Sequence, residues 1–303
     1  MRIWIENIVG SIVGVMSFCL YCINTIFWSL PIFALSVFKL IPFASSRKFI
    51  TILLDFCAAS WVSVNTVIQK ILSPMKITVT GDLNLSKKDW YLVISNHQSW
   101  VDIVVLQRVF NGKIPFLKFF LKEQLRYVPI LGLTWWALDF PFMKRYTKSF
   151  LAKNPHLKGK DLATTREACE KFKYKPVSVM NFIEGTRYTD KKHENQNSKY
   201  TGLLKPKSGG IGFVFTVMGE QLHKVIDVTI YYPQQIPTFW HFLSGRIRNV
   251  SMHIDVHEIT QDIIGDYSTD KEYKKRLHSW INGIWTQKQE TLLQLKLQSE
   301  SQT

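Results

Sequence analysis

The feature that most constrains this chain is a charge-free stretch near its start, residues 7–38, which is mostly apolar. A helix that crosses the hydrocarbon core of a bilayer needs about 20 predominantly apolar residues, and this stretch is longer than that. It is also too long for the core of a signal peptide, and no clear cleavage site of small residues follows it. We therefore expect a membrane helix here, with a buried helix of a globular core as the alternative.

A second apolar stretch, residues 49–72, contains Asp55 and several uncharged polar side chains. This mixture is typical of a helix that lies against the bilayer or only partly enters it. Basic residues gather in the link between the two stretches, and the positive-inside tendency assigns that link to the cytoplasm. We therefore expect residues 1–73 to be membrane-anchoring helices, and the protein to be integral to a membrane or tightly bound to it.

From Pro74 onward the chain alternates short apolar runs with amphipathic segments, which is the pattern of an α/β domain. The expected fold is a central mixed sheet flanked by helices over residues 74–265, followed by a C-terminal amphipathic helix within residues 266–303. The expected strands cover residues 76–80, 90–95, 137–145, 177–183, 224–233 and 250–259. The expected helices cover residues 100–110, 118–126, 161–172, 211–218 and 271–298, and residues 188–204 are expected to form a polar loop.

The most informative segment of this domain is residues 90–102, which predicts a strand, a tight turn and a helix. An apolar run ends at Ser95, polar residues follow, and an apolar pattern with helical spacing begins at Val101. His97 lies in the turn, and Asp102 lies in the first turn of the helix. Because ligands of α/β folds bind at the carboxyl ends of strands, this turn is a candidate catalytic site.

A histidine paired with a carboxylate can act as a general base. Asp102 can fold back across the turn, fix the tautomer of His97 and stabilise the imidazolium that forms. The chain has no Gly-x-Ser-x-Gly elbow to mark a nucleophile, so direct attack by a substrate hydroxyl is the favoured scheme. The alternative role of Asp102 is structural, as the capping-box partner of an N-cap at Ser99, and that role is compatible with catalysis.

A second strand end carries groups suited to phosphate. The expected strand 177–183 is followed by Glu184, Gly185, Thr186 and Arg187. The glycine lets the backbone approach a ligand closely, while the threonine hydroxyl and the guanidinium can bind phosphate oxygens. We expect the carboxylate of Glu184 to orient a cation or a loop and not to act as a base.

The charge of the chain also points to an acidic ligand. The formal net charge is +15 and the pI is about 9.6, so nucleic acid, an anionic lipid surface and a phosphorylated substrate are the partners to consider. The apolar N-terminal stretches favour the two lipid-related choices. The expected strand 137–145 ends in Lys144 and Arg145, and a guanidinium offers a planar fork that matches phosphate oxygens.

These motifs resemble a known family. Asn96-His97-x4-Asp102 is similar to the NHxxxxD signature of the glycerolipid acyltransferases, the 1-acylglycerol-3-phosphate acyltransferase superfamily, and Phe182 to Arg187 is similar to the third motif of that family. Residues 142–145 resemble the second motif, although Asp139 stands where the family commonly has a glycine. The segment from Glu184 to Glu194 resembles the eukaryotic-type branch, which includes the lysocardiolipin acyltransferases. The resemblance covers about residues 75–260.

The resemblance implies a membrane-bound acyltransferase. The enzyme would move an acyl chain from acyl-CoA or acyl-ACP to the free hydroxyl of a lysophospholipid, with 1-acyl-sn-glycerol-3-phosphate as the first choice and phosphatidic acid as the product. It implies no metal or cofactor, a site that faces the cytoplasm, and a location in the bacterial inner membrane. The implied site consists of a catalytic pair, His97 and Asp102; substrate-binding residues Arg145, Glu184, Gly185, Thr186 and Arg187; and supporting residues Asn96 and Lys144.

Three alternatives stay open. The acceptor can be lysocardiolipin or lysophosphatidylglycerol, which would make the protein a remodelling enzyme. It can be water, which would make it a thioesterase. Finally, the chain can be a membrane-anchored module that binds polyanions without catalysis, although nucleic acid is not expected as a partner. A phosphate-bearing lipid acceptor, an acyl thioester, the bilayer and acyl carrier protein are the partners that the leading hypothesis implies.

Overall fold

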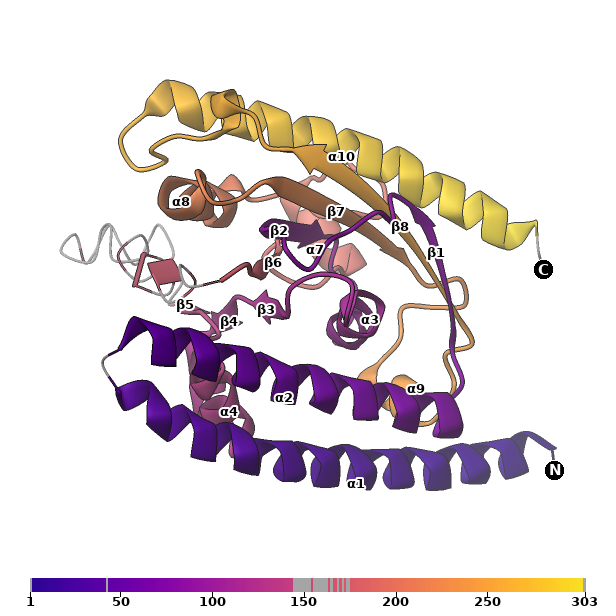
Figure 1. The fold of residues 1–303 in the computed structure, drawn as a ribbon. Helices are drawn as coiled ribbons and strands as arrows, with labels where there is room; N and C mark the ends of the chain where they lie inside the picture. The colour runs from indigo at the N-terminus through magenta and orange to yellow at the C-terminus, as the bar shows by residue number, and fades with distance from the viewer. Residues whose placement is uncertain are drawn as a thin grey trace.

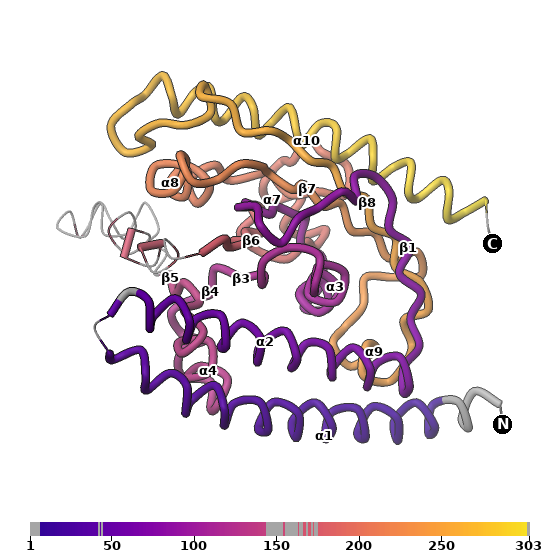
Figure 2. Tube along the Cα trace, viewed as in Figure 1, coloured from indigo at the N-terminus to yellow at the C-terminus, as the bar shows by residue number. Residues whose placement is uncertain are grey.

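The computed structural model describes residues 2–41, 43–143, 154, 163, 166–167, 169–170, 172 and 175–301. Two long helices come first, α1 (Arg2–Val37) and α2 (Ala44–Leu72), joined by the short 3₁₀ helix η1 (Phe38–Leu40). They pack against each other as an antiparallel hairpin along one side of the molecule (Figures 1 and 2). Both helices are long and apolar enough to cross a membrane, which agrees with the expected helix pair.

The rest of the described chain forms a mixed sheet with helices on both faces. Its strands are β1 (Lys76–Gly81), β2 (Tyr91–Ser95), β3 (Leu117–Phe119), β6 (Ser178–Phe182), β7 (Lys224–Tyr231) and β8 (Asn249–Glu258). They lie in the order β1-β8-β7-β2-β6-β3, and all neighbours are parallel except β7 and β8. A separate two-stranded sheet joins β4 (Leu121–Lys122) to β5 (Phe142–Met143). The expected fold class is confirmed.

The helices complete the architecture. They are α3 (Val101–Phe110), η2 (Glu123–Tyr127), α4 (Leu131–Ala137), α7 (Asp190–Gln196), α8 (Ser208–Met218), α9 (Phe239–Leu243), η4 (Gln261–Ile263) and α10 (Lys271–Glu300). Figure 1 shows the hairpin and α3 on one side of the sheet and α8 and α10 on the other.

The central strand β2 explains this layering. All five of its residues are buried, as expected for a strand covered on both faces. Tyr91 and Val93 belong to the apolar cluster shared with α2 and α3, while Leu92 and Ile94 belong to the cluster shared with α8 and α10. Alternate side chains therefore fill the two opposite cores, because successive residues of a strand point to opposite faces.

The domain contacts α1 at Gly14 and again towards its C-terminal end. Gly14 leaves room for the ring of Trp240 in α9, because a Cβ at this glycine would lie 2.8 Å from that indole. Towards the other end, the hydroxyl of Ser29 is 2.8 Å from that of Thr134 in α4, and Lys39 donates to the carbonyl of Ala137 at 2.7 Å. The hairpin is therefore part of the folded body of the protein and not a separate tether.

Three local predictions were wrong. Residues 118–126 do not form a helix, because Leu117–Phe119 pair with β6 and a 3₁₀ helix follows. In the described part of the predicted strand 137–145, residues 137–143, only Phe142–Met143 is a strand, and Ala137 is the last residue of α4. The predicted loop 188–204 contains α7, whose N-cap Thr189 accepts from the backbone of Lys192. Half of the residues of the predicted helix 161–172 lie outside the described residues.

Candidate active site

The register of the parallel strands brings two sequence motifs together. Ser95, the last residue of β2, lies opposite Phe182 of β6 and Val228 of β7. His97 and Glu184 each come two residues after these paired positions, so both leave the sheet at the same edge. Their proximity is measurable, because the backbone N–H of His97 donates to Glu184 Oε2 at 3.1 Å.

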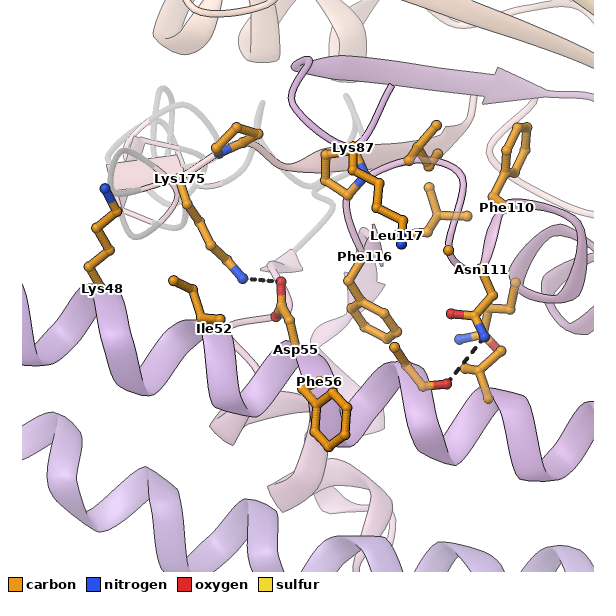
Figure 3. Close-up of a pocket in the computed structure, with 17 residues that line it drawn as sticks. Lys48, Ile52, Asp55, Phe56, Lys87, Phe110, Asn111, Phe116, Leu117 and Lys175 are labelled. Carbon is orange, nitrogen blue, oxygen red and sulfur yellow. Dashed lines mark hydrogen bonds and ion pairs between the residues drawn. The ribbon is translucent and has the colours of Figure 1, made fainter. Parts of the chain in front are cut away.

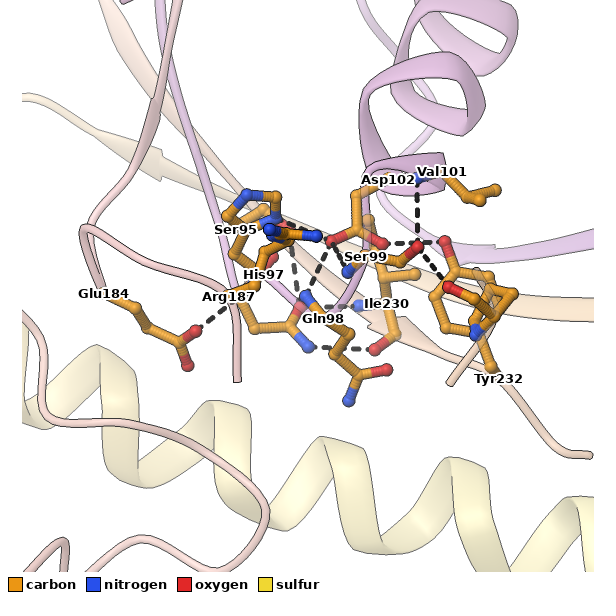
Figure 4. Close-up of polar contacts among 12 residues, drawn as sticks. Ser95, His97, Gln98, Ser99, Val101, Asp102, Glu184, Arg187, Ile230 and Tyr232 are labelled. Carbon is orange, nitrogen blue, oxygen red and sulfur yellow. Dashed lines mark hydrogen bonds and ion pairs between the residues drawn. The ribbon is translucent and has the colours of Figure 1, made fainter. Parts of the chain in front are cut away.

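The ring of His97 is bound to Asp102. Nδ1 of His97 lies 2.9 Å from Oδ2 of Asp102, as Figure 4 shows. Since the carboxylate is acceptor-only when ionised, this bond assigns the proton of a neutral imidazole to Nδ1 and leaves Nε2 as the basic nitrogen. The carboxylate is fully buried, while the histidine side chain keeps 13% of its surface exposed. This is the arrangement of a base held by a buried partner.

Four donors surround the carboxylate of Asp102. In addition to His97, the backbone N–H groups of Gln98 and Ser99 donate to Oδ2 at 2.7 and 2.9 Å. The hydroxyl of Tyr232 donates to Oδ1 at 2.7 Å. Burial and the nearby Asp102 raise the pKa of Tyr232 well above its usual value, so the phenol keeps its proton and stays a donor. The carboxylate therefore has one fixed orientation.

The N-cap of α3 is Trp100 and not the expected Ser99, and Trp100 makes no side-chain cap bond. The N–H of Ser99 donates to Oδ2 of Asp102, but the N–H of Asp102 donates to the backbone carbonyl of Ser99 and not to its hydroxyl, so the expected capping box is incomplete. The hydroxyl of Ser99 instead accepts from the N–H of Val101 at 3.1 Å and donates to the carbonyl of Pro237 at 2.5 Å. Ser99 thus helps to fix the carboxylate that holds the histidine.

Asn96 fixes the turn to the neighbouring strand. Its side-chain amide donates to the carbonyl of Ile230 at 2.9 Å and its side-chain oxygen accepts from the N–H of the same residue at 2.8 Å. It therefore pairs with β7 as a backbone residue would, one position after β2 ends. Asn96, the predicted supporting residue, therefore links the end of β2 to β7.

Glu184 is fully buried and binds two backbone segments. Oε2 accepts from His97 N–H, and Oε1 accepts from Leu204 N–H at 3.0 Å. Burial raises the pKa of Glu184 to about 8, and these two amides together with Lys288 oppose that rise. The predicted role, orienting a loop and not acting as a base, fits this geometry.

Aromatic and cationic groups line the other side of the ring of His97. Phe182 stacks on it with the ring centroids 3.9 Å apart and an interplanar angle of 14°. The N–H of Tyr188 donates to the carbonyl of His97 at 2.7 Å, which joins the loop after β6 to the turn. The guanidinium of Arg187 lies over the ring of Trp100, 4.8 Å from its centroid. A cation is therefore held close to the histidine turn.

The remaining residues of the second motif shape the loop. Gly185 has a φ of +73°, a backbone conformation that favours glycine. The hydroxyl of Thr186 accepts from Lys192 Nζ at 2.9 Å, and the same ammonium donates to the carbonyl of Arg187 at 2.8 Å. Lys192 therefore adds a second cation beside Arg187.

The predictions for the site divide into three groups. The structure brings together Asn96, His97, Asp102 and the segment from Glu184 to Arg187. Lys144 and Arg145 lie outside the described residues. Sequence reasoning missed Tyr232, whose only signal was its position just after an expected buried strand, and it assigned no role to Phe182 although that residue belongs to a quoted motif.

An apolar cavity of about 710 Å³ opens between the hairpin and the domain next to this site. Trp100, the partner of Arg187, lines it together with Ile103, Val104 and Gln107 of the same segment. The remaining walls come from α1, α2 and α9 and from residues between Phe119 and Phe140. Its lining is predominantly apolar, so it can hold a hydrocarbon chain.

A second cavity of about 510 Å³ lies at the opposite edge of the sheet (Figure 3). Residues that precede β2, β3 and β6 line it, among them Lys87, Leu117 and Lys175. Lys175 is paired with Asp55 of α2 across this cavity. It shares Val62 and Gln107 with the first cavity, so the two meet beside α3.

Comparison with known proteins places this geometry in a family. A family model described as "Acyltransferase" matches residues 76–232. The chain is 25% identical over 278 residues to lysocardiolipin acyltransferase 1 of Gallus gallus, covering 85% of this chain and 68% of the relative. It is 32% identical over 215 residues to the 1-acyl-sn-glycerol-3-phosphate acyltransferase of Saccharomyces cerevisiae, covering 69% of this chain and 62% of the relative.

A solved structure shares the fold. The crystal structure of PlsC, the 1-acyl-sn-glycerophosphate acyltransferase of Thermotoga maritima, matches with a TM-score of 0.53 and 18% identity over 95% of this chain and 97% of that chain. The match includes both N-terminal apolar helices, which indicate membrane association. The family model covers the histidine turn, the loop after β6 and Tyr232 in a single segment. The chain therefore belongs to the acyltransferase family of enzymes.

Proposed function

We propose that this protein is a membrane-bound glycerolipid acyltransferase that acylates the free hydroxyl of 1-acyl-sn-glycerol-3-phosphate and forms phosphatidic acid. The acyl donor is a thioester, acyl-CoA or acyl-ACP. The observation that carries the proposal is the bond of 2.9 Å between His97 Nδ1 and the buried Asp102, which leaves Nε2 available as a base.

The reaction follows from this assignment. His97 Nε2 takes the proton of the lipid hydroxyl while the oxygen of that hydroxyl forms a bond to the thioester carbonyl carbon. The tetrahedral intermediate then collapses, the carbon–sulfur bond breaks, and the departing sulfur takes the proton from His97. Asp102 stabilises the imidazolium between these steps, in the manner of other carboxylate–histidine pairs.

Cations suit the phosphate of the acceptor. Arg187 and Lys192 lie beside the histidine turn, and we propose that they bind the phosphate together with the hydroxyl of Thr186. Lys144 and Arg145, which follow β5, are proposed as further phosphate ligands on the strength of the motif alone. The acyl chain of the donor would occupy the apolar cavity beside Trp100.

We also propose that the hairpin lies in one face of the membrane and does not cross it. The domain contacts Gly14 of α1 and Lys39 of η1, directly after α1, and a helix that spanned the bilayer would place these two contacts on opposite sides. Apolar side chains exposed on α1, α4 and α9 would enter the lipid together. The cytoplasmic face and the bacterial inner membrane stay predictions, which fractionation of the source cells tests.

Acyl transfer is tested with the purified protein, labelled acyl-CoA or acyl-ACP, and a panel of lysolipids. We expect the labelled chain in phosphatidic acid, and we expect His97→Ala to abolish transfer while the protein stays folded. Turnover by this variant at the rate of the natural protein would refute the mechanism.

Lysocardiolipin is the second candidate acceptor, because the Gallus gallus relative carries that name. The same panel separates the candidates. Preferential labelling of cardiolipin would select lysocardiolipin, preferential labelling of phosphatidylglycerol would select lysophosphatidylglycerol, and free fatty acid as the sole product would select hydrolysis.

A further inference from the structure

The C-terminal helix α10 reaches the active-site loops although it lies beyond the segment that matches the family model, residues 76–232. It crosses the face of the sheet formed by β7, as the yellow helix in Figure 1 shows. Two fully buried side chains, Trp285 and Lys288, leave it three residues apart. Side chains at this spacing lie on one face of a helix, so both point into the domain.

Trp285 is joined to His97 by a chain of hydrogen bonds. Its indole Nε1 donates to the carbonyl of Leu204 at 2.9 Å, and the N–H of Leu204 donates to Glu184 Oε1 at 3.0 Å. The other oxygen of Glu184 accepts from the N–H of His97. Three bonds thus connect the helix to the backbone of the histidine turn.

Lys288 introduces a positive charge beneath the same loops. Its ammonium donates to the carbonyl of Val228 at 2.6 Å and to the hydroxyl of Thr229 at 3.2 Å, and it lies 2.7 Å from a carboxylate oxygen of Asp227. Val228 is the β7 residue opposite Ser95, so the charge is anchored beside the end of β2. A buried ammonium needs such partners, because its desolvation is costly.

We propose that Trp285 and Lys288 are positioning residues of the acyl-transfer site. Trp285 fixes the loop at Leu204, and Lys288 supplies a positive charge that favours the ionised form of Glu184, the form in which both carboxylate oxygens can accept from the amides of His97 and Leu204. This inference rests on the function proposed above. It makes α10 a part of the active site without contact with the reacting atoms.

The charges around Glu184 should affect the pH dependence of acyl transfer. The charged groups that act on it are Asp102 from the turn after β2 and Lys288 from α10, His97 faces it through its backbone N–H, and its own charge acts on Tyr188 of the same loop. Lys288 favours the carboxylate and Asp102 disfavours it. The acidic limb of the pH profile of kcat/KM should therefore move when the charge at Lys288 changes. Loss of the positive charge should move the limb to higher pH, and loss of the negative charge that is paired with it should move the limb to lower pH.

The test is the pH profile of acyl transfer by the full-length protein in detergent, with acyl-CoA and the acceptor that the natural protein uses. Lys288→Met removes the positive charge, and we expect the acidic limb to move to higher pH by about one unit. Asp227→Asn leaves Lys288 unpaired, and we expect the limb to move to lower pH. Trp285→Phe keeps the aromatic ring but loses the donor, and we expect kcat to fall about tenfold.

Lys296→Met is the matched control, because Lys296 is an exposed lysine of the same helix. We expect it to leave the profile unchanged. If Lys288→Met does not fold, Asp227→Asn still tests the inference, because it should move the acidic limb in the opposite direction, to lower pH. Folded variants at 227 and 288 that keep the limb of the natural protein would overturn the inference. Absence of acyl transfer in the natural protein is a different result, and it would refute the proposed function itself.

Discussion

At the scale of single residues, the orientation of one carboxylate decides whether His97 can act as a base. Asp102 has its two oxygens occupied by donors from three sources: the ring of His97, two backbone amides and the phenol of Tyr232. A carboxylate with this many directional bonds has little freedom to rotate. Hence the tautomer of the histidine is set by groups that never meet the substrate.

Removal of one of these donors should weaken catalysis without weakening substrate binding. We expect Tyr232→Phe to lower kcat about tenfold and to leave KM unchanged, because the bond to a charged acceptor is worth about 1.5 kcal/mol or more. Tyr231→Phe is the control at the neighbouring position, where the phenol does not contact Asp102. Steady-state kinetics of both variants provide the measurement, and equal rates in the two would contradict this role for Tyr232.

Glu184 should make the stability of the protein depend on pH. Its pKa is raised from 4.5 to about 8 by burial, so the folded protein keeps this proton over a range in which the unfolded chain has lost it. The free energy of unfolding should therefore fall as pH rises from about 4.5 to about 8, by about 5 kcal/mol in total from this group.

Glu184→Gln should remove that dependence, because the amide does not titrate. Thermal unfolding in detergent at pH values between 5 and 9 measures the difference between the two proteins. A variant with the same pH dependence as the natural protein would show that another group causes it. Reduced acyl transfer is expected as well, since the amide retains only one acceptor oxygen for the two backbone donors.

At the scale of elements, the parallel pairing of β2 with β6 and β7 assembles the site. Each strand delivers its motif at its carboxyl end, and the pairing of Ser95 with Phe182 and Val228 aligns those ends within a residue. The helix pair adds the other half, because the apolar cavity beside Trp100 has walls from both the hairpin and the domain. The polar groups of the site and the apolar cavity therefore come from different parts of the chain.

The cavity allows a prediction about chain length. Val104 of α3 lines it, and Val104→Trp would fill part of its volume of about 710 Å³. We expect lower turnover of long-chain acyl donors and unchanged turnover of short-chain donors, because only the long chains need the full depth. Competition assays with mixed acyl donors measure the ratio. Val67→Trp, at an exposed position of α2 that does not line the cavity, is the control.

At the scale of the whole molecule, the hairpin and the domain form one body. Gly14 of α1 packs on α9, and Lys39 of η1, directly after α1, packs on the end of α4. The two positions are about 38 Å apart along the helix axis at 1.5 Å for each residue. This separation exceeds the hydrocarbon thickness of a bilayer, which is about 30 Å. A domain on one side of the membrane can reach both points only if α1 does not cross it.

The position of the hairpin can be tested with cysteine labelling. In a background with Cys19→Ser and Cys22→Ser, we expect Ser11→Cys in α1 and Ser45→Cys at the start of α2 to react with a membrane-impermeant thiol reagent from the same side of sealed vesicles. Both of these serines are exposed. Labelling from opposite sides would show that α1 spans the bilayer.

Much of this protein could be predicted from local sequence. The charge-free residues 7–38 indicate the first long helix, since few other structures can contain so many consecutive apolar residues. The apolar run before His97 predicts a buried strand for the same kind of local reason, and its motif predicts the family. The bond between His97 and Asp102 could also be predicted from the sequence, because the two residues are only five positions apart and a single turn can bring them together.

Other features depend on contacts between distant parts of the chain, and only the tertiary structure decided them. Lys118 is buried in a strand and not on a helix because β3 pairs with β6, which is about 60 residues away. Asp139 has a left-handed φ of +59°, a conformation that favours glycine, and its charge is paired with Lys39 of the hairpin. Tyr232 reaches Asp102 across 130 positions of sequence, and Lys288 reaches Val228 across 60. No local periodicity encodes such contacts, because they form only when the sheet brings separate segments together.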